Sequence, residues 1–110
     1  MKNDITTLQD KITYVQDTLS TINGKWKLPI LMSMFDGKSR FRDLQRSVPG
    51  ITTRVLSKEL KDLESNKLII RIVNNSYPVT IDYKLTTYSF TLTPVVAEMI
   101  KWGKQRTKGL

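Results

Sequence analysis

Aliphatic residues recur at helical spacing over the first fifth of the chain. Within residues 3–22 they follow one another at intervals of three or four positions: Ile5, Leu8, Ile12, Val15, Leu19 and Ile22. This spacing places them on one face of a helix. Such a face can pack on the protein's own core or against a second copy of the chain, and we expect it to do both.

The next segment, residues 25–35, carries apolar side chains on nearly every side, which is typical of a buried central helix. Pro29 is tolerated only near the first turn of a helix, so this helix should begin close to Lys25. The pairs Asn23-Gly24 and Asp36-Gly37 are turn signals before and after it. The pattern predicts one helix at the centre of a small core.

Two further helices are predicted on either side of a tight turn at Pro49-Gly50. Ser39 can cap the first, residues 40–47, and Thr52 can cap the second, residues 53–66. Two helices joined in this way, with apolar residues on their facing sides, are typical of a helix-turn-helix. We therefore expect this motif over about residues 39–66.

The second helix of the motif, the recognition helix, has two different faces at 100° per residue. Its core face comprises Val55, Leu56, Leu60 and Leu63. Its opposite face is narrow, basic and hydroxylic, with Arg54, Ser57, Lys58, Lys61 and Ser65. Acidic residues flank this stripe without entering it, and we expect Glu59 and Asp62 to form solvated ion pairs with Lys58 or Lys61. The segregation favours a binding face.

From residue 68 the pattern changes from helical to extended. Residues 68–73 and 80–85 are rich in β-branched and alternating apolar side chains, with a turn from Asn74 to Pro78 between them. They predict a β-hairpin over about residues 68–86. Residues 87–105 resume a helical pattern, in which Pro94 either kinks the helix or lies near its start. The expected fold class is α+β, mainly α: a helix-turn-helix followed by a β-hairpin in one domain, residues 1–110, with terminal helices at 3–22 and 87–105.

Composition excludes several classes of function. The 110 residues suit one domain, and they include neither Cys nor His. Disulfides, thiol redox chemistry, the usual zinc sites and the commonest general base are therefore absent. No phosphate-cradling glycine loop or convergent carboxylate pair replaces them, so we expect no enzyme, metal or cofactor. The sequence also shows no membrane span and no signal peptide, which makes the cytoplasm the expected location and gives no membrane partner.

The net charge of +8 points to an anionic partner. Seven basic and only two acidic residues lie between Gly37 and Lys61, on the predicted helix-turn-helix. Counterion release favours such a surface on duplex phosphates. A membrane surface would instead require a basic amphipathic helix with exposed aromatic residues. The coincidence of charge with motif favours double-stranded DNA.

The chain resembles the HxlR-type winged helix-turn-helix regulators of bacteria and archaea, relatives of the MarR-like group. The matching pieces run in order over about residues 13–103: Ile22-Asn23-Gly24-Lys25-Trp26, Arg40-Phe41-x-x-Leu44, Val48-Pro49-Gly50-Ile51, Leu56-x-x-x-Leu60-x-x-Leu63-Glu64, Leu68-Ile69-x-Arg71, Pro78, and Asp82-Tyr83-x-Leu85-Thr86. The resemblance implies a homodimer that binds operator DNA and regulates transcription. It also implies a dimer interface formed by the terminal helices, a recognition helix in the major groove and a hairpin that acts as the wing.

These inferences give two sets of candidate site residues. The DNA-binding candidates are Arg40, Arg42, Thr52, Thr53, Arg54, Ser57, Lys58, Lys61, Asn74, Asn75, Ser76 and Tyr77. The dimer-interface candidates are Ile5, Leu8, Ile12, Val15, Val96, Met99, Ile100 and Trp102. Arg54 is expected to read bases, and Lys58 and Lys61 to bind phosphates, with Arg40 and Arg42 as further phosphate candidates. A winged helix used only for protein contacts stays open as the alternative, and the sequence identifies no effector.

Three positions depart from the family pattern. Thr13 stands where the family often has a cysteine, so sensing through a thiol is not implied. Lys67 and Ser89 stand where the family has glycines. Because asparagine tolerates the left-handed conformation, we expect Asn66 to cap the recognition helix in place of the first glycine. Because Ser89 stands in place of the second family glycine, the sequence does not determine the residue at which the last helix begins.

Overall fold

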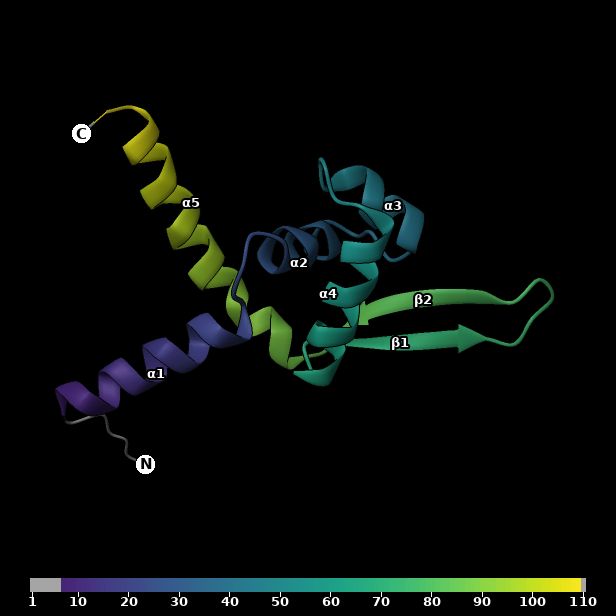
Figure 1. Ribbon diagram of the computed structural model, residues 1–110, viewed down its shortest axis with the longest axis horizontal. Helices are drawn as coiled ribbons and strands as arrows, with labels where there is room; N and C mark the ends of the chain where they lie inside the picture. The colour runs from purple at the N-terminus through teal and green to yellow at the C-terminus, as the bar shows by residue number, and fades with distance from the viewer. Residues whose placement is uncertain (1–6, 110) are drawn as a thin grey trace.

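The computed structural model describes residues 7–109, and its elements follow the predicted order (Figure 1). The helices are α1 (Leu8–Thr21), α2 (Lys27–Phe35), α3 (Phe41–Ser47), α4 (Thr53–Ser65) and α5 (Thr93–Thr107), with a 3-10 helix η1 (Tyr88–Leu92) before the last. The strands β1 (Ile69–Asn74) and β2 (Thr80–Leu85) pair antiparallel, with Ile69 opposite Leu85 and Asn74 opposite Thr80. This arrangement confirms the winged helix-turn-helix. The predicted interface residue Ile5 lies outside the described residues.

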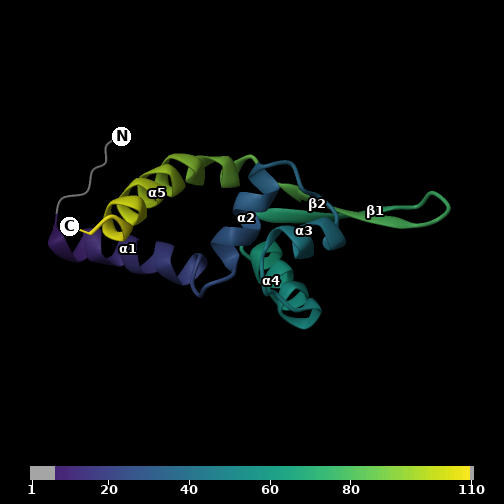
Figure 2. The same cartoon turned by 90° about the horizontal axis from the view of Figure 1, so that it is seen from above.

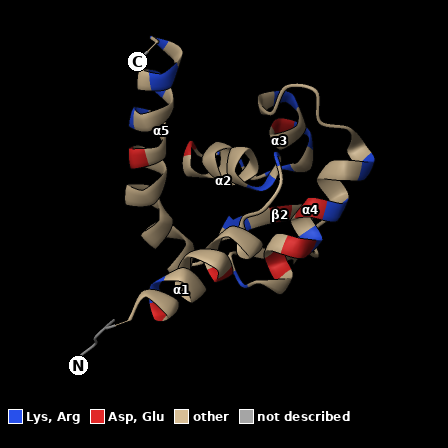
Figure 3. Ribbon diagram, turned by 60° about the vertical axis from the view of Figure 1, so that its left-hand side comes forward, with Lys and Arg blue, Asp and Glu red and all other residues tan. Residues whose placement is uncertain are grey.

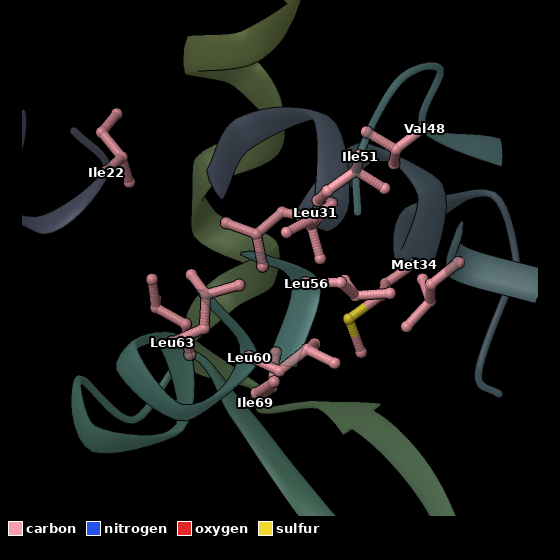
Figure 4. Close-up of a cluster of buried hydrophobic side chains, with 12 residues drawn as sticks. Ile22, Leu31, Met34, Val48, Ile51, Leu56, Leu60, Leu63 and Ile69 are labelled. Atoms are coloured by element: carbon pink, nitrogen blue, oxygen red, sulfur yellow. The ribbon is translucent and has the colours of Figure 1, made fainter. Parts of the chain in front are cut away.

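The hydrophobic core lies where α2, α3, α4 and the base of the hairpin meet (Figure 4). Leu56, Leu60 and Leu63 recur at intervals of four and three along α4, so all three point into this core and are buried. They meet Leu31 of α2 and Ile69 of β1, which are equally buried. The core face predicted for the recognition helix is therefore confirmed, and the opposite face of α4 points to solvent.

Two helix starts differ from the prediction. The helix expected to begin near Lys25 begins at Lys27, which leaves Pro29 as its third residue, where a backbone N–H has no partner inside the helix. Ser39 does not cap α3; its hydroxyl lies 3.5 Å from Oδ1 of Asp82 on β2 instead. Thr52 caps α4 as expected, since its Oγ1 accepts from the backbone N–H of Val55 at 3.2 Å. The Ser39 side chain is directed to Asp82 by a tertiary contact that the local sequence cannot show.

The end of α4 corrects the expected role of Asn66. Asn66 has φ −88°, whereas Lys67 takes the left-handed conformation with φ +62°. The backbone N–H of Lys67 donates to the carbonyl of Glu64 and that of Leu68 to the carbonyl of Leu63, both at 3.0 Å. This pair of bonds is the Schellman motif, and the residue after the cap is the one that must be left-handed. Asn66 lies one position before the left-handed residue, so it does not replace the family glycine.

We expect Lys67→Gly to raise the free energy of unfolding by about 1 kcal/mol. The left-handed conformation costs a residue with a Cβ about 1–2 kcal/mol, and the greater freedom of glycine in the unfolded chain offsets part of the gain. Urea denaturation of wild type and variant measures the difference. Asn66→Gly is the matched control, because Asn66 has negative φ and its replacement should lower stability. A less stable Lys67→Gly would contradict this account of the helix end.

The last predicted helix is divided in two. Pro94 is the second residue of α5, so it lies at a helix start and does not kink a helix. Ser89, at the position of a family glycine, lies in η1 and is fully buried, and its hydroxyl donates to the carbonyl oxygen of Thr86 at 2.7 Å. The short η1 thus joins the hairpin to α5 by a fixed turn.

The terminal helices project from the body of the protein on the side opposite the hairpin (Figures 1 and 2). None of the residues of α1 is buried. The radius of gyration is 16.4 Å, whereas a compact chain of this length has about 13 Å. In the described part of the chain, no helix is long and apolar enough to cross a membrane. The chain therefore presents two arms, and apart from Val96 of α5 none of their side chains is buried.

Candidate nucleic-acid interface

The solvent-facing side of α4 carries the residues predicted to meet DNA. Arg54, Ser57, Lys58 and Lys61 are all exposed, and Thr52 and Thr53 lie at the exposed N-terminal end of the helix. The Oγ1 of Thr53 accepts from Nε2 of Gln45 on α3 at 3.1 Å, and this bond fixes the two helices of the motif to one another. The turn between them contains Gly50 with φ +82°, a conformation that glycine adopts without strain.

Ion pairing separates the basic residues of the helix-turn-helix into two groups. Lys38, Arg40, Arg46 and Lys58 each lie within 3.1 Å of a carboxylate oxygen, on Asp36, Asp82, Asp43 and Asp62 respectively. Arg42, Arg54 and Lys61 have no acidic partner within residues 7–109. Figure 3 shows how closely acidic and basic positions follow each other along α4. Within the helix-turn-helix, these three unpaired basic residues carry the positive charge that is available to an anion.

A shallow hollow lies between α3 and the first turn of α4. Its lining is formed by Phe41, Arg42, Gln45, Arg46 and Thr53. The two guanidinium groups beside the N-terminal end of α4 make this a favourable place for a phosphate, because unsatisfied backbone N–H groups at a helix N-terminus attract anions. The predicted phosphate role of Arg42 fits this position.

Arg40 and Asn74, two of the predicted DNA-binding residues, are joined by a contact between the wing and the helix-turn-helix. Arg40 Nε donates to Oδ1 of Asp82, and Asn74 Nδ2 donates to Oδ2 of the same carboxylate at 2.8 Å. Asn74 also donates to Oγ1 of Thr80 at 3.1 Å. Arg40 therefore holds the hairpin against the helix-turn-helix, and Asn74 uses its amide nitrogen within the hairpin. Asn75, Ser76 and Tyr77 at the tip of the wing are exposed.

The charge state of Asp82 keeps this anchor intact at neutral pH. Its hydrogen bonds from Arg40 and then from Asn74 lower the pKa of the Asp82 carboxyl below its usual value. Because the folded-state pKa is depressed, the contribution is present above the ordinary aspartate range and is lost only as the pH falls through the lowered value. The orientation of the wing is thus insensitive to pH near 7.

Sequence reasoning missed Arg71, which lies on β1 opposite Tyr83 of β2. These two residues line a polar hollow together with Ser57, Leu60, Lys61 and Glu64 of α4. Arg71 is exposed and adds a second cation next to Lys61. Strand alternation could have indicated this position, because Arg71 shares a face of the hairpin with the buried Ile69 and so points toward α4.

The expected ion pairs of Glu59 and Asp62 are correct for only one of the two acids. Asp62 Oδ2 lies 3.1 Å from Nζ of Lys58, and this pairing lowers the pKa of Asp62 and raises that of Lys58. Glu59 instead pairs with Lys27 of α2, at 2.6 Å between Nζ and Oε1. The side chains of Lys27 and Glu59 are only 8% and 12% exposed. This pair joins the first residue of α2 to α4, a contact that the sequence of α4 alone does not reveal.

Most of the dimer-interface candidates are uncovered in the protomer. On α1, Leu8, Ile12, Val15 and Leu19 are 44–65% exposed, and on α5, Met99, Ile100 and Trp102 are 47–67% exposed. Val96 differs, because it is only 7% exposed and is already packed within the protomer. Val95, next to it, is 43% exposed. The apolar faces of the two arms are available to a partner.

Residues 7–109 contain no cluster of three potential metal ligands among acidic, His and Cys side chains. The predicted DNA-binding residues on α4 and at the tip of the wing offer cations, hydroxyls and an amide. These groups bind phosphates and base edges through hydrogen bonds and charge.

Comparisons with known proteins agree with this architecture. The family model described as "HxlR-like helix-turn-helix" matches residues 21–109 of this chain. The uncharacterized HTH-type transcriptional regulator YybR of Bacillus subtilis is 40% identical over 90 residues, which cover 82% of this chain and 72% of YybR. The reduced form of the redox regulator HypR has a TM-score of 0.79 and 38% identity, over 86% of this chain and 93% of HypR. A protein of Enterococcus faecalis V583 assigned to the MarR family of transcriptional regulators has a TM-score of 0.82 and 36% identity, over 97% and 96% of the two chains.

Proposed function

This chain belongs to the HxlR-like helix-turn-helix family, and from this premise we infer that it is a transcriptional regulator that binds double-stranded DNA as a homodimer. The observation that carries the inference is a group of three unpaired cations on the helix-turn-helix. Arg42, Arg54 and Lys61 lie on α3 and α4, the two helices of the motif, and none of them has an acidic partner among the described residues. Such a surface is suited to the phosphates and base edges of a duplex.

We assign different tasks to the parts of this surface. The N-terminal end of α4, with Arg54, enters the major groove and reads bases, while Arg42 and Lys61 bind phosphates on either side. Lys58 can join them by leaving Asp62. The tip of the wing carries no charge, so its exposed groups, among them the fully exposed Tyr77, form hydrogen bonds with the backbone or the minor groove.

A two-fold dimer follows from the two exposed apolar faces on α1 and α5. Symmetry then presents two recognition helices to one duplex, and the operator is a pseudo-palindrome with half-sites about one helical turn, roughly 34 Å, apart or a multiple of that distance. The regulatory signal is not a thiol reaction, because the chain has no cysteine. A noncovalent ligand or a protein partner is compatible with this composition.

Binding to duplex DNA should weaken steeply with salt if this proposal is right. Each phosphate contact contributes a slope of about −0.9 to the dependence of log K on log salt concentration. Titration of the protein into a labelled mixed-sequence duplex at several salt concentrations measures the slope. We expect it to correspond to at least two phosphate contacts per protomer, those assigned to Arg42 and Lys61.

The alternative, a winged helix used only for protein contacts, predicts a different result. Such a protein would show, at physiological salt, no duplex binding beyond the weak nonspecific attraction expected from its net charge of +8. Triple replacement of Arg42, Arg54 and Lys61 by alanine provides the internal comparison, since it removes the unpaired cations and leaves the four ion pairs in place. Equal binding by this variant and by wild type would contradict the assigned surface.

A further inference from the structure

The recognition helix α4 has no net charge of its own. It contains three basic residues and three acidic ones: Arg54, Lys58 and Lys61, and Glu59, Asp62 and Glu64. A surface that lies against phosphates is stabilised by positive charge and weakened by negative charge. The affinity of this helix for DNA therefore depends on what neutralises its carboxylates.

The neutralising cation comes from a different helix. Lys27 is the first residue of α2, and its Nζ lies 2.6 Å from Oε1 of Glu59 and 3.5 Å from Oδ2 of Asp62. The Lys27 side chain is only 8% exposed, so its charge is held inside the protein under α4. It cannot reach a phosphate itself, but it lies against two of the three acids of the recognition helix.

Asp62 is shared between two lysines. Its Oδ2 accepts from Nζ of Lys58 at 3.1 Å as well as facing Lys27 at 3.5 Å. The Lys58 side chain is 68% exposed and lies on the face that we assign to DNA. Asp62 competes with a phosphate for the Lys58 ammonium, and Lys27 is the cation that stays with Asp62 when Lys58 turns toward a phosphate.

We propose that Lys27 is a positioning residue for DNA binding, which masks Glu59 and Asp62 and so releases Lys58 to a phosphate. The inference rests on the proposed DNA-binding function. Without Lys27, Lys58 is the remaining cation beside Asp62 and stays there, and Glu59 adds an uncompensated negative charge below the binding surface. Removal of a side chain that never touches DNA thus weakens DNA binding.

The first test is the coupling between two residues that do not touch each other. With a mixed-sequence duplex at low salt, Lys27→Met should weaken binding about three- to tenfold. Lys58→Ala should weaken wild type by a similar factor but change the Lys27→Met protein little, because Lys58 is already withheld from phosphate. Independent, multiplying effects of the two replacements would overturn the proposal. Lys101→Met is the matched control: it also removes one lysine from an acid pair, with Glu98 at 3.1 Å on α5, and should leave affinity unchanged.

The second test is rescue by removing the masked charges. Lys27→Met combined with Glu59→Gln and Asp62→Asn should restore affinity to the wild-type value or above, because no carboxylate then competes for Lys58. A purely structural role of Lys27 predicts instead that this protein binds as weakly as Lys27→Met. Failure of the rescue in a protein with a wild-type circular dichroism spectrum would overturn the proposal.

Lys27→Met alone leaves the buried Glu59 without its partner, which is strongly destabilising. A second series of variants therefore tests the proposal in a protein that keeps its fold. Lys27→Met with Glu59→Met replaces the buried pair by apolar side chains, a change that proteins tolerate well. Addition of Asp62→Asn should then tighten duplex binding about threefold or more, since it frees Lys58. Equal duplex affinity of the double variant and of the triple variant that adds Asp62→Asn would overturn the masking role of Lys27 and leave the proposed DNA-binding function standing. Absence of duplex binding by wild type would overturn the proposed function and with it this inference.

Discussion

Ile12→Asp is expected to convert the protein into a monomer at micromolar concentrations and to abolish high-affinity operator binding. Ile12 lies near the middle of the exposed apolar face that Leu8, Val15 and Leu19 continue along α1. In a two-fold dimer the replacement places an unpaired carboxylate in the interface from each subunit. Burial of such a charge costs several kcal/mol, and 1.4 kcal/mol corresponds to a factor of ten in the dissociation constant.

The loss of the dimer should reduce operator affinity by a further, separate route. A dimer that holds one half-site binds the second as an intramolecular step, and this step raises the overall affinity about 10²- to 10⁴-fold. A monomer loses that gain, although its α4 surface is unchanged. Sedimentation velocity gives the oligomeric state, and titration with the operator and with a single half-site gives the two affinities.

Thr13→Asp is the matched control for this experiment. It adds the same charge to α1, but Thr13 lies about 100° further round the helix from Ile12. The polar residues Asp10 and Asp17 share that side of the helix. We expect Thr13→Asp to remain a dimer with wild-type operator affinity. A dimeric Ile12→Asp, or a monomeric wild type, would contradict the interface that we assign to the terminal helices.

Arg54→Ala should weaken operator binding by about 1–3 kcal/mol and mixed-sequence binding by much less. Arg54 is the second residue of α4, is exposed and has no acidic partner among the described residues. An arginine at the start of a recognition helix can donate two hydrogen bonds to O6 and N7 of guanine, which is the source of this discrimination. The variant should therefore accept more sequences at one base pair of each half-site.

The measurement starts from an operator selected out of a random duplex library with the wild-type protein. Wild type and Arg54→Ala are then titrated against this operator and a mixed-sequence duplex at two salt concentrations. Lys61→Ala is the contrasting variant, because loss of a phosphate contact weakens both duplexes alike and lowers the salt slope by about one. Equal losses on both duplexes for Arg54→Ala would show that Arg54 binds phosphate. No loss on either would contradict the placement of α4 in the groove.

The helices and the wing could be predicted because their signals are local. The spacing of Leu56, Leu60 and Leu63 determines which side of α4 is buried, and the change to β-branched residues after position 68 marks the hairpin. The exposed basic side of α4 follows from the same periodicity. The signals were weaker at element ends, where Lys27 and not Lys25 begins α2 and where Ser39 does not act as a cap.

The partners of Lys27 and Arg40 were decided by the tertiary structure alone, whereas the pairs Lys58–Asp62 and Arg46–Asp43 lie at helical spacing. The pairs Lys27–Glu59 and Arg40–Asp82 join residues 32 and 42 positions apart, and helical spacing predicts only contacts within a few positions. Likewise, Lys67 and not Asn66 is left-handed because the chain must turn there to bring Leu68 onto the core beside Leu63. The sequence by itself determined which faces are apolar and where positive charge accumulates, since both follow from periodicity. Beyond those local pairs, the packing of α2 and the wing against the helix-turn-helix decided which of those charges remain available to DNA, because a long-range ion pair depends on the distance between two atoms in space.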